Sequence, residues 1–169
     1  MYCDFKKISK AEDGSLMIES IIATSLIVIG ILGIMSLLAR SASLSHYTSH
    51  SLQATYLAAE GMEVIKNILD TDVAMNAPWG SSVPSDGTYC VYFNTETLTP
   101  CAGSGGVVYD ATSGFYQQPL YLQPSFFQRI VQITGSGGAF NVSSTVSWYE
   151  NGVQKSVTLD DAFQGWRTP

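Results

Sequence analysis

The sequence predicts an α+β protein: one long N-terminal helix, transmembrane in its first half, packs through its second half on a C-terminal antiparallel β-sheet. Two observations predict this class. The residues from Ser20 to Ala39 carry no charge and are mostly apolar, and twenty such residues form about 30 Å of helix, the thickness of the hydrocarbon core of a bilayer. The last 80 or so residues instead contain short apolar runs between turns rich in glycine, proline and asparagine, which is typical of strands.

A single carboxylate, Glu19, stands at the start of the apolar run. Placing an ionisable group at the centre of a bilayer costs roughly 2.5–3.5 kcal/mol, so such a residue usually has a function. The run is too long for a secretory signal peptide, and the residues after it, Arg40–Ser43, are not a convincing cleavage site. Three lysines precede the run and Arg40 alone follows it closely. This asymmetry predicts that the first residues stay in the cytoplasm and that the rest of the chain is exported.

The segment Gly14-Ser15-Leu16-Met17-Ile18-Glu19 resembles the class III signal of type IV pilins and type II secretion pseudopilins, in which a polar leader, a glycine and a glutamate precede an apolar helix. The resemblance implies that residues 1–14 are a leader peptide. It also implies that a prepilin peptidase cuts the Gly14–Ser15 bond and methylates the new amine of Ser15. The alternative is a plain single-pass anchor in which Glu19 is incidental.

The resemblance also implies a role for Glu19 in assembly. In this family the equivalent glutamate pairs with the N-terminal amine of a neighbouring subunit and sets the axial register of a helical filament. A buried charge is tolerated only when it is paired, so Glu19 and the amine of Ser15 would satisfy each other in an apolar filament core. The implied partners are the prepilin peptidase, other pilin subunits, the inner-membrane assembly platform and, before assembly, membrane lipid.

The helix is expected to contain a transmembrane or filament-core part over residues 15–40 and an outer part over residues 41–70. A hydroxyl-rich stretch at 41–51 weakens it. Beyond this stretch, apolar residues recur at three- and four-residue spacings and predict a stripe that docks on a sheet: Tyr56, Leu57, Gly61, Val64, Ile65, Ile68 and Leu69. The opposite face is expected to carry Glu60, Glu63, Lys66 and Asn67.

His46 and His50 are one helical turn apart, but two ligands without a third make a poor metal site. We therefore expect two polar residues on a solvated helix face, and neither a metal nor another cofactor.

Residues 71–169 are expected to form a globular, β-rich head domain that begins with a loop reaching Asp86. The predicted strands are Tyr89–Phe93, Val107–Asp110, Gln128–Thr134, Asn141–Tyr149 and Val153–Leu159. The dipeptide Asn151-Gly152 predicts a two-residue hairpin between the last two strands. Residues Gly135–Gly138 predict a flexible connection between the two strands before that hairpin.

Of the three cysteines, Cys3 lies in the leader, while Cys90 and Cys101 lie in the head. An even pair in an exported domain predicts one disulfide. The alternatives are a redox-active pair, for which Cys-x-x-Cys spacing is usual, and a metal site, which requires more ligands.

Charge and motifs exclude two classes of function. Of 14 acidic and 8 basic residues, three of each precede Ser15, so the exported part keeps the net charge of −6. Phosphate binding requires clustered Lys and Arg, so no direct nucleic-acid partner is expected. An enzyme would need a nucleophile with a base or paired carboxylates in a cleft. No Gly-x-Ser-x-Gly, His-Glu-x-x-His or similar motif is present and both histidines lie in the helix, so the protein is not expected to be an enzyme.

The chain resembles PilV-type minor pilins and the minor pseudopilins of type II secretion in its helix residues 56–68 and in four later segments: Phe127–Val131, Val146–Trp148, Ser156–Leu159 and Trp166-Arg167. The run Ile29–Gly33 in the apolar span is similar to the same family. The resemblance implies a subunit that helps to initiate or modify a type IV pilus or a related filament. It would first be a single-pass protein of the inner membrane with its C-terminal domain outside, and later part of an extracellular or periplasmic filament. The alternative is a membrane-anchored surface adhesin that does not polymerise. The aromatic-rich segment Tyr109–Phe127 would then be a binding surface rather than a loop packed on the sheet.

Overall fold

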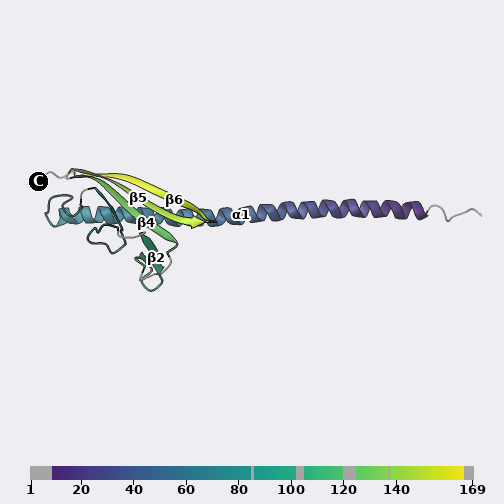
Figure 1. The fold of residues 1–169 in the computed structure, drawn as a ribbon, viewed down its shortest axis with the longest axis horizontal. Coiled ribbons are helices and arrows are strands. Elements are labelled where there is room, and N and C mark those ends of the chain that lie inside the picture. The colour runs from purple at the N-terminus through teal and green to yellow at the C-terminus, as the bar shows by residue number, and fades with distance from the viewer. Residues whose placement is uncertain (1–8, 85, 102–104, 120–124, 137, 166–169) are drawn as a thin grey trace, which may run out of the picture. The chain divides into compact units, whose positions relative to one another are not determined.

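A computed structural model describes residues 9–84, 86–101, 105–119, 125–136 and 138–165, and its side chains from residue 14 onward. The chain divides into two compact units, residues 1–46 and residues 47–169. Helix α1, Ser9–Ala74, runs through the boundary between them (Figure 1). The predicted α+β class is confirmed, because the second part of this helix packs on an antiparallel sheet. The helix ends at Ala74, beyond the end expected at residue 70.

The sheet contains six strands: β1 (Gly87–Tyr89), β2 (Gly106–Asp110), β3 (Phe115–Gln117), β4 (Phe127–Ser136), β5 (Ala139–Glu150) and β6 (Val153–Gln164). All pairs are antiparallel, and the spatial order is β3-β2-β4-β5-β6. Strands β1 and β2 pair with the same edge of β4. Strand β2 pairs with residues 127–128 of β4, and β1 pairs with residues 131–133. Strands β4, β5 and β6 lie along the second part of α1 (Figure 1).

Four of the five predicted strands are confirmed, and the last three are longer than expected. The prediction of a strand at Tyr89–Phe93 was wrong, because the chain leaves the sheet after Tyr89. The carbonyl of Val91 instead accepts hydrogen bonds from a buried arginine, and the apolar side chain of Val91 enters the core from a loop. Strand β3 was not predicted, since three residues carry no readable period.

The hairpin between β5 and β6 is confirmed. Asn151 and Gly152 have φ angles of 51° and 76°, and both form the two-residue turn that closes at Glu150 and Val153. Two successive left-handed residues match the right-handed twist of the flanking strands. The connection between β4 and β5 is shorter than the expected residues 135–138, because Gly135, with a φ of 118°, is still in β4 and pairs with Phe140.

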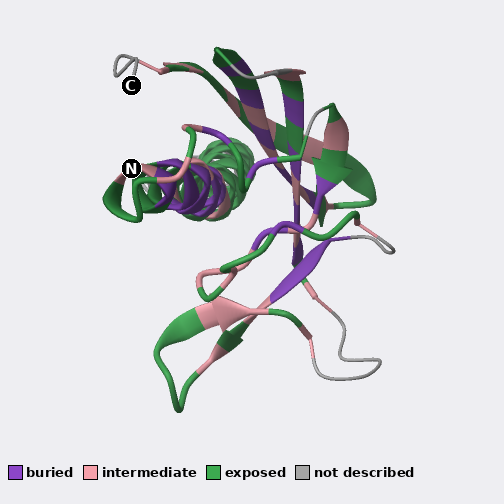
Figure 2. Ribbon diagram, turned by 90° about the vertical axis from the view of Figure 1, so that its left-hand side faces the viewer, coloured by how far each residue is buried: buried purple, intermediate pink, exposed green. Residues whose placement is uncertain are grey.

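The buried stripe of α1 faces the inner side of β4 and β5 (Figure 2). It consists of Ala54, Leu57, Ala58, Gly61, Val64, Ile65, Ile68 and Leu69. The predicted stripe was therefore right except for Tyr56, whose side chain is 69% exposed. Five residues of helix turn by about 140°, so Tyr56 cannot share the face of Gly61.

Gly61 lies where helix and sheet approach most closely. A Cβ atom at this position would lie 2.7 Å from the hydroxyl of Ser144 on β5 and 3.2 Å from Cδ of Arg129 on β4. The missing side chain therefore sets the distance between α1 and the sheet.

Candidate functional site

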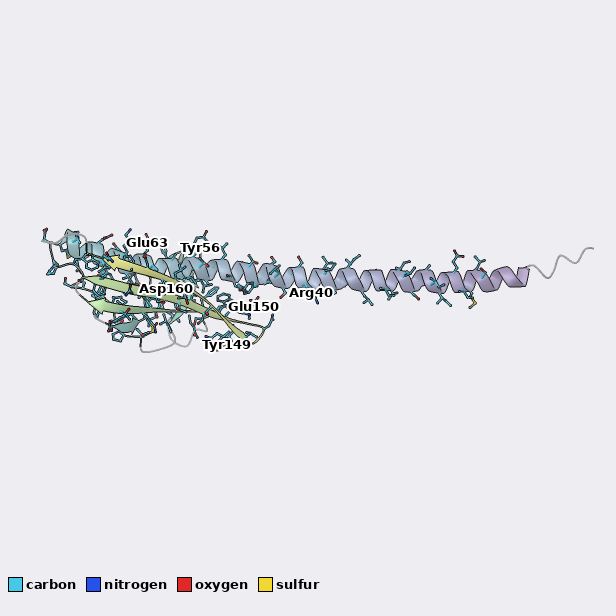
Figure 3. All side chains as sticks on the ribbon, turned by 90° about the horizontal axis from the view of Figure 1, so that it is seen from above. Arg40, Tyr56, Glu63, Tyr149, Glu150 and Asp160 are labelled. Carbon is cyan, nitrogen blue, oxygen red and sulfur yellow. A yellow bond between two sulfur atoms is a disulfide. The ribbon has the colours of Figure 1, made fainter. Side chains whose placement is uncertain are left out.

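The first described part of α1, residues 14–46, exposes apolar side chains on every side (Figure 3). The large ones are 50–70% exposed: Leu16, Met17, Ile18, Ile21, Ile22, Leu26, Ile27, Val28, Ile29, Ile31, Leu32, Ile34, Met35, Leu37 and Leu38. An amphipathic helix would confine such residues to one stripe. Among the described residues, α1 is the one helix long and apolar enough to cross a membrane. An apolar surface of this kind requires a cover of lipid or protein.

The hydroxyl groups in this segment are satisfied within the helix. Ser20 donates to the carbonyl of Met17 (2.9 Å), Ser25 donates to that of Ile21 (2.7 Å), and Thr24 donates to that of Ser20. A hydroxyl that bonds back to its own helix does not require water. These side chains are therefore compatible with an apolar surrounding.

Glu19 is the only ionisable residue between Gly14 and Ala39. It lies on one side of the helix together with Ser15, Ile22 and Leu26. Among the described residues, no hydrogen bond or ion pair reaches its carboxylate. Covering this surface with apolar atoms would bury an unpaired charge, which is costly, and a cation beside the carboxylate would lower that cost.

Gly14 and Ser15 lie within the helical part of the chain, and a Cβ atom added to Gly14 would meet nothing within 4 Å among the described residues. Comparisons with known protein families, with curated proteins and with solved structures find no match for this chain.

The main polar cluster in the head was missed by the sequence analysis. Arg129 on β4 is fully buried, and its Nε and Nη2 donate to the carbonyl of Val91 at 2.9 and 2.6 Å. Its Nη1 donates to the helix carbonyl of Leu57 at 2.9 Å. Both Nη atoms lie 3.3 Å from a carboxylate oxygen of Glu60. Arg129 thus joins the helix, the sheet and the loop after β1.

The expectation that Glu60 faces solvent was wrong in part, because its side chain is 31% exposed and paired with Arg129. The strand pattern could have located this cluster. Arg129 lies on the same face of β4 as the buried residues Phe127, Val131 and Ile133, because side chains two positions apart in a strand point to the same side. Its side chain must therefore point inward, where it needs hydrogen-bond acceptors.

Burial lowers the pKa of Arg129, and the neighbouring Glu60 opposes this effect. An arginine keeps its proton even so. Burial also raises the pKa of Tyr92, and the charge of Arg129 opposes it. Arg129 therefore acts in the cluster as a charged donor that joins three segments of the chain.

The predicted disulfide between Cys90 and Cys101 is present, with Cα atoms 4.6 Å apart. The amide of Cys101 donates to the carbonyl of Thr88 at 3.0 Å, next to a bridge between Tyr89 and Pro100. Inside the closed loop, Val91 and Leu98 are buried in the core. The disulfide therefore fixes the loop whose carbonyl binds Arg129.

The expectation of two solvated histidines holds for exposed His46 but was wrong for His50. The ring of His50 lies 4.7 Å from that of Phe126, and its Nδ1 lies 4.0 Å from Glu150 on β5. His50 falls on the side of α1 that carries the buried stripe, which explains the difference. In the described part of the chain, no group of three or more His, Cys, Asp or Glu is arranged to hold a metal ion.

The aromatic-rich segment at 109–127 is partly exposed, and its residues 120–124 lie outside the described chain. Tyr109, Phe115 and Phe126 are 55%, 54% and 48% exposed. Phe115 stacks on Phe93 with ring centres 4.7 Å apart, and Tyr109 contacts Tyr116 at 5.4 Å. The β2–β3 hairpin that carries most of these rings projects away from β4, β5 and β6 (Figure 2).

Proposed function

We propose that the protein is a minor pilin or pseudopilin, processed by a prepilin peptidase and built into a type IV pilus or related filament to initiate or modify assembly. The observation that carries this proposal is the helix at residues 14–46, apolar on all sides, with Glu19 as its one ionisable group up to Ala39. Neighbouring helices of the same kind could cover such a surface, and the processed amine of Ser15 supplies the cation that Glu19 requires.

The exported head gives the subunit an outer surface. The positive residues before Ser15 favour a leader on the cytoplasmic side of the inner membrane, and a disulfide fits an oxidising compartment outside it. In the proposal the chain is first a single-pass membrane protein contacting lipid and the assembly platform. It then leaves the membrane with other pilin subunits.

Removing the carboxylate tests assembly. We expect Glu19→Ala to remain in membranes and to be absent from sheared surface fibres, because an unpaired buried charge costs about 3–5 kcal/mol. That is more than a hundredfold in an assembly equilibrium. An antibody to the head, applied to fibres and membranes, measures the ratio. Glu63→Ala is the matched control, since it removes an exposed carboxylate from the head part of the same helix. Equal fibre signals from wild type and Glu19→Ala would refute the proposal.

Processing is tested at the Gly14–Ser15 bond. The mature chain should begin with N-methylated Ser15, and Gly14→Val should block cutting because a β-branched side chain obstructs the peptidase. Intact-mass analysis of protein from cells containing an active prepilin peptidase measures both. Recovery of a chain that retains residues 1–14 in that strain would contradict the proposal.

A membrane-anchored adhesin is the second candidate, supported by the exposed rings of Tyr109, Phe115 and Phe126. Exposed aromatic residues are frequent anchors in binding surfaces. Wild-type protein confined to membranes, with the leader retained, would favour this candidate over a filament subunit.

A further inference from the structure

Strand β6 forms an open edge of the sheet. It is last in the strand order, and among the described residues no strand pairs with its outer side. Its register with β5 is unbroken from Glu150↔Val153 to Ala139↔Gln164, so β6 contains no bulge, and it contains no proline. Natural edge strands are usually short, bulged or interrupted because an open edge pairs with other chains. This one is 12 residues long.

The backbone groups that face outward can be identified. Beyond the end of the ladder, the amide of Gly165 donates to the carbonyl of Gly138. Hydrogen-bonded positions alternate along an antiparallel strand, so the odd-numbered residues of β6 bond to β5. The amides and carbonyls of the even-numbered residues therefore point to the open edge: Gln154, Ser156, Thr158, Asp160, Ala162 and Gln164. One of these amides, that of Ala162, donates to the carboxylate of Asp161 at 2.8 Å and would have to exchange this bond for one to the second strand.

We propose that β6 pairs with β6 of a second copy of this chain, antiparallel and centred on Thr158. The outward amides and carbonyls of one β6 strand can bond only to those of the other, so each even-numbered residue must face an even-numbered residue. The twofold axis must then pass through a residue position rather than between two residues. Centring on Thr158 places Lys155 opposite Asp161 of the second copy, and twofold symmetry repeats the pair. No other allowed register joins these two charges.

The remaining side chains match in the same register. Val157 faces Leu159, and Val153 faces Phe163, on the same side of the sheet as the charge pair. These are the non-hydrogen-bonded positions, where opposing Cα atoms are about 4.5 Å apart and side chains interact most closely. Moving the centre to Val157 would place Lys155 opposite Leu159, and moving it to Leu159 would place Lys155 opposite Phe163. Both neighbouring registers lose the charge pair.

The pairing has a defined direction. Strand β6 begins at the hairpin near His50 and ends near Trp79, so it runs in the same direction as residues 47–74 of α1 (Figure 1). Antiparallel β6 strands therefore place these two helical segments in opposite directions. If the proposed function holds, this pairing joins the heads of two subunits.

Cysteine cross-linking of the full-length chain in detergent tests the pairing. In a Cys3→Ser background, Thr158→Cys places two thiols on the twofold axis, where Cα atoms of a hydrogen-bonded pair are about 5.5 Å apart, a distance suited to a disulfide. Oxidised glutathione should produce a covalent dimer. Thr145→Cys is the matched control, because Thr145 faces Thr158 from β5. Two Thr145 residues would be about 14 Å apart across three strand spacings.

Charge reversal tests the register. With Thr158→Cys present, Lys155→Asp should lower the dimer yield by about tenfold, since like charges then face each other twice. Adding Asp161→Lys should restore the yield. No dimer from Thr158→Cys, equal dimer from Thr145→Cys, or a cross-link to another protein would each overturn the proposal. The assay uses neither fibres nor leader cleavage, so its outcome is independent of the tests of Glu19 and Gly14.

Discussion

The two parts of α1 differ in how their side chains are covered. Residues 14–46 are exposed throughout, whereas residues 47–74 bury one stripe beneath the sheet. Both parts contain glycine, yet a Cβ atom at Gly30 or Gly33 would meet nothing within 4 Å among the described residues, while one at Gly61 would meet Ser144 and Arg129. Glycine therefore allows the helix and the sheet to approach closely in the second part of α1. In the first part, the glycines have no such neighbour among the described residues.

This difference shows that helical pattern alone does not identify a binding surface. The part with a clear stripe has already used it inside the subunit. The part without a stripe has no partner among the described residues, and its apolar surface requires a cover of lipid or protein. Substitutions in the covered part should change the stability of the head, and substitutions in the uncovered part should not.

The largest effect in the covered part is expected at Arg129. Arg129→Met should destabilise the head by about 3 kcal/mol, because the carbonyls of Val91 and Leu57 and the carboxylate of Glu60 lose their donor. Urea unfolding of the full chain in detergent, followed by tryptophan fluorescence, measures this change. Glu60→Gln is the control and should cost about 1 kcal/mol, since an amide oxygen can still accept from the guanidinium. Equal losses of unfolding free energy for both substitutions would show that the charge pair with Glu60, and not the hydrogen bonds donated by Arg129 to Val91 and Leu57, joins the helix, the sheet and the loop.

The disulfide should contribute nearly as much. Cys90→Ser with Cys101→Ser should lower the free energy of unfolding by about 3 kcal/mol, as expected for a short closed loop. Reduction of the wild type should match the double substitution in the same unfolding assay. A loss confined to the reduced wild type would indicate that the reductant acts elsewhere.

The two kinds of glycine give a matched comparison. Gly61→Val should destabilise the head by about 1–3 kcal/mol, because the new side chain overlaps Ser144 and Arg129. Gly33→Val should leave the unfolding midpoint of the head unchanged. Similar midpoint shifts from both substitutions would contradict the assignment of one covered and one uncovered part.

The smallest effect is expected at an exposed carboxylate of the head. The amide of Thr112, which donates to Asp110 at 2.9 Å, lowers the pKa of Asp110, with a further contribution from Ser113. A carboxyl group whose pKa is lower in the folded than in the unfolded state stabilises the folded state at pH values above the unfolded-state pKa. This stabilisation is lost as the pH falls through the lowered pKa of the folded state. Asp110→Asn should therefore lower the melting temperature slightly at pH 7 and by less at pH 2. A larger effect at pH 2 would contradict the direction of the shift.

Much of the fold could be predicted because its signals are local. The helical stripe, the strand alternation of β5 and the Asn151-Gly152 turn each lie within a few residues of sequence. The contacts of Arg129 could not be predicted in the same way, because they join residues 38 to 72 positions apart in the chain. Tyr56 and His50 were misplaced for a different reason, because a turn of about 100° per residue already places Tyr56 off the face of Gly61 and His50 on the face of Ala54 and Leu57.

The candidate site differs from the fold in this respect. Gly14, Ser15 and Glu19 were identified from a short motif, and the structure adds the exposed apolar surface around Glu19 but no partner for it within the described chain. A site completed by another molecule leaves no contact inside one subunit. Its test must therefore measure assembly rather than folding.

The strand order has a consequence for biosynthesis. The stripe at residues 47–74 is synthesised first, but β4, β5 and β6, which cover it, come last. At roughly 5–20 residues per second, the ribosome needs several seconds to pass from Ala74 to the start of β4. During that interval the stripe is exposed on a nascent chain. The head can close only after its C-terminal strands have emerged, so a chaperone that protects this segment would have to act before translation ends.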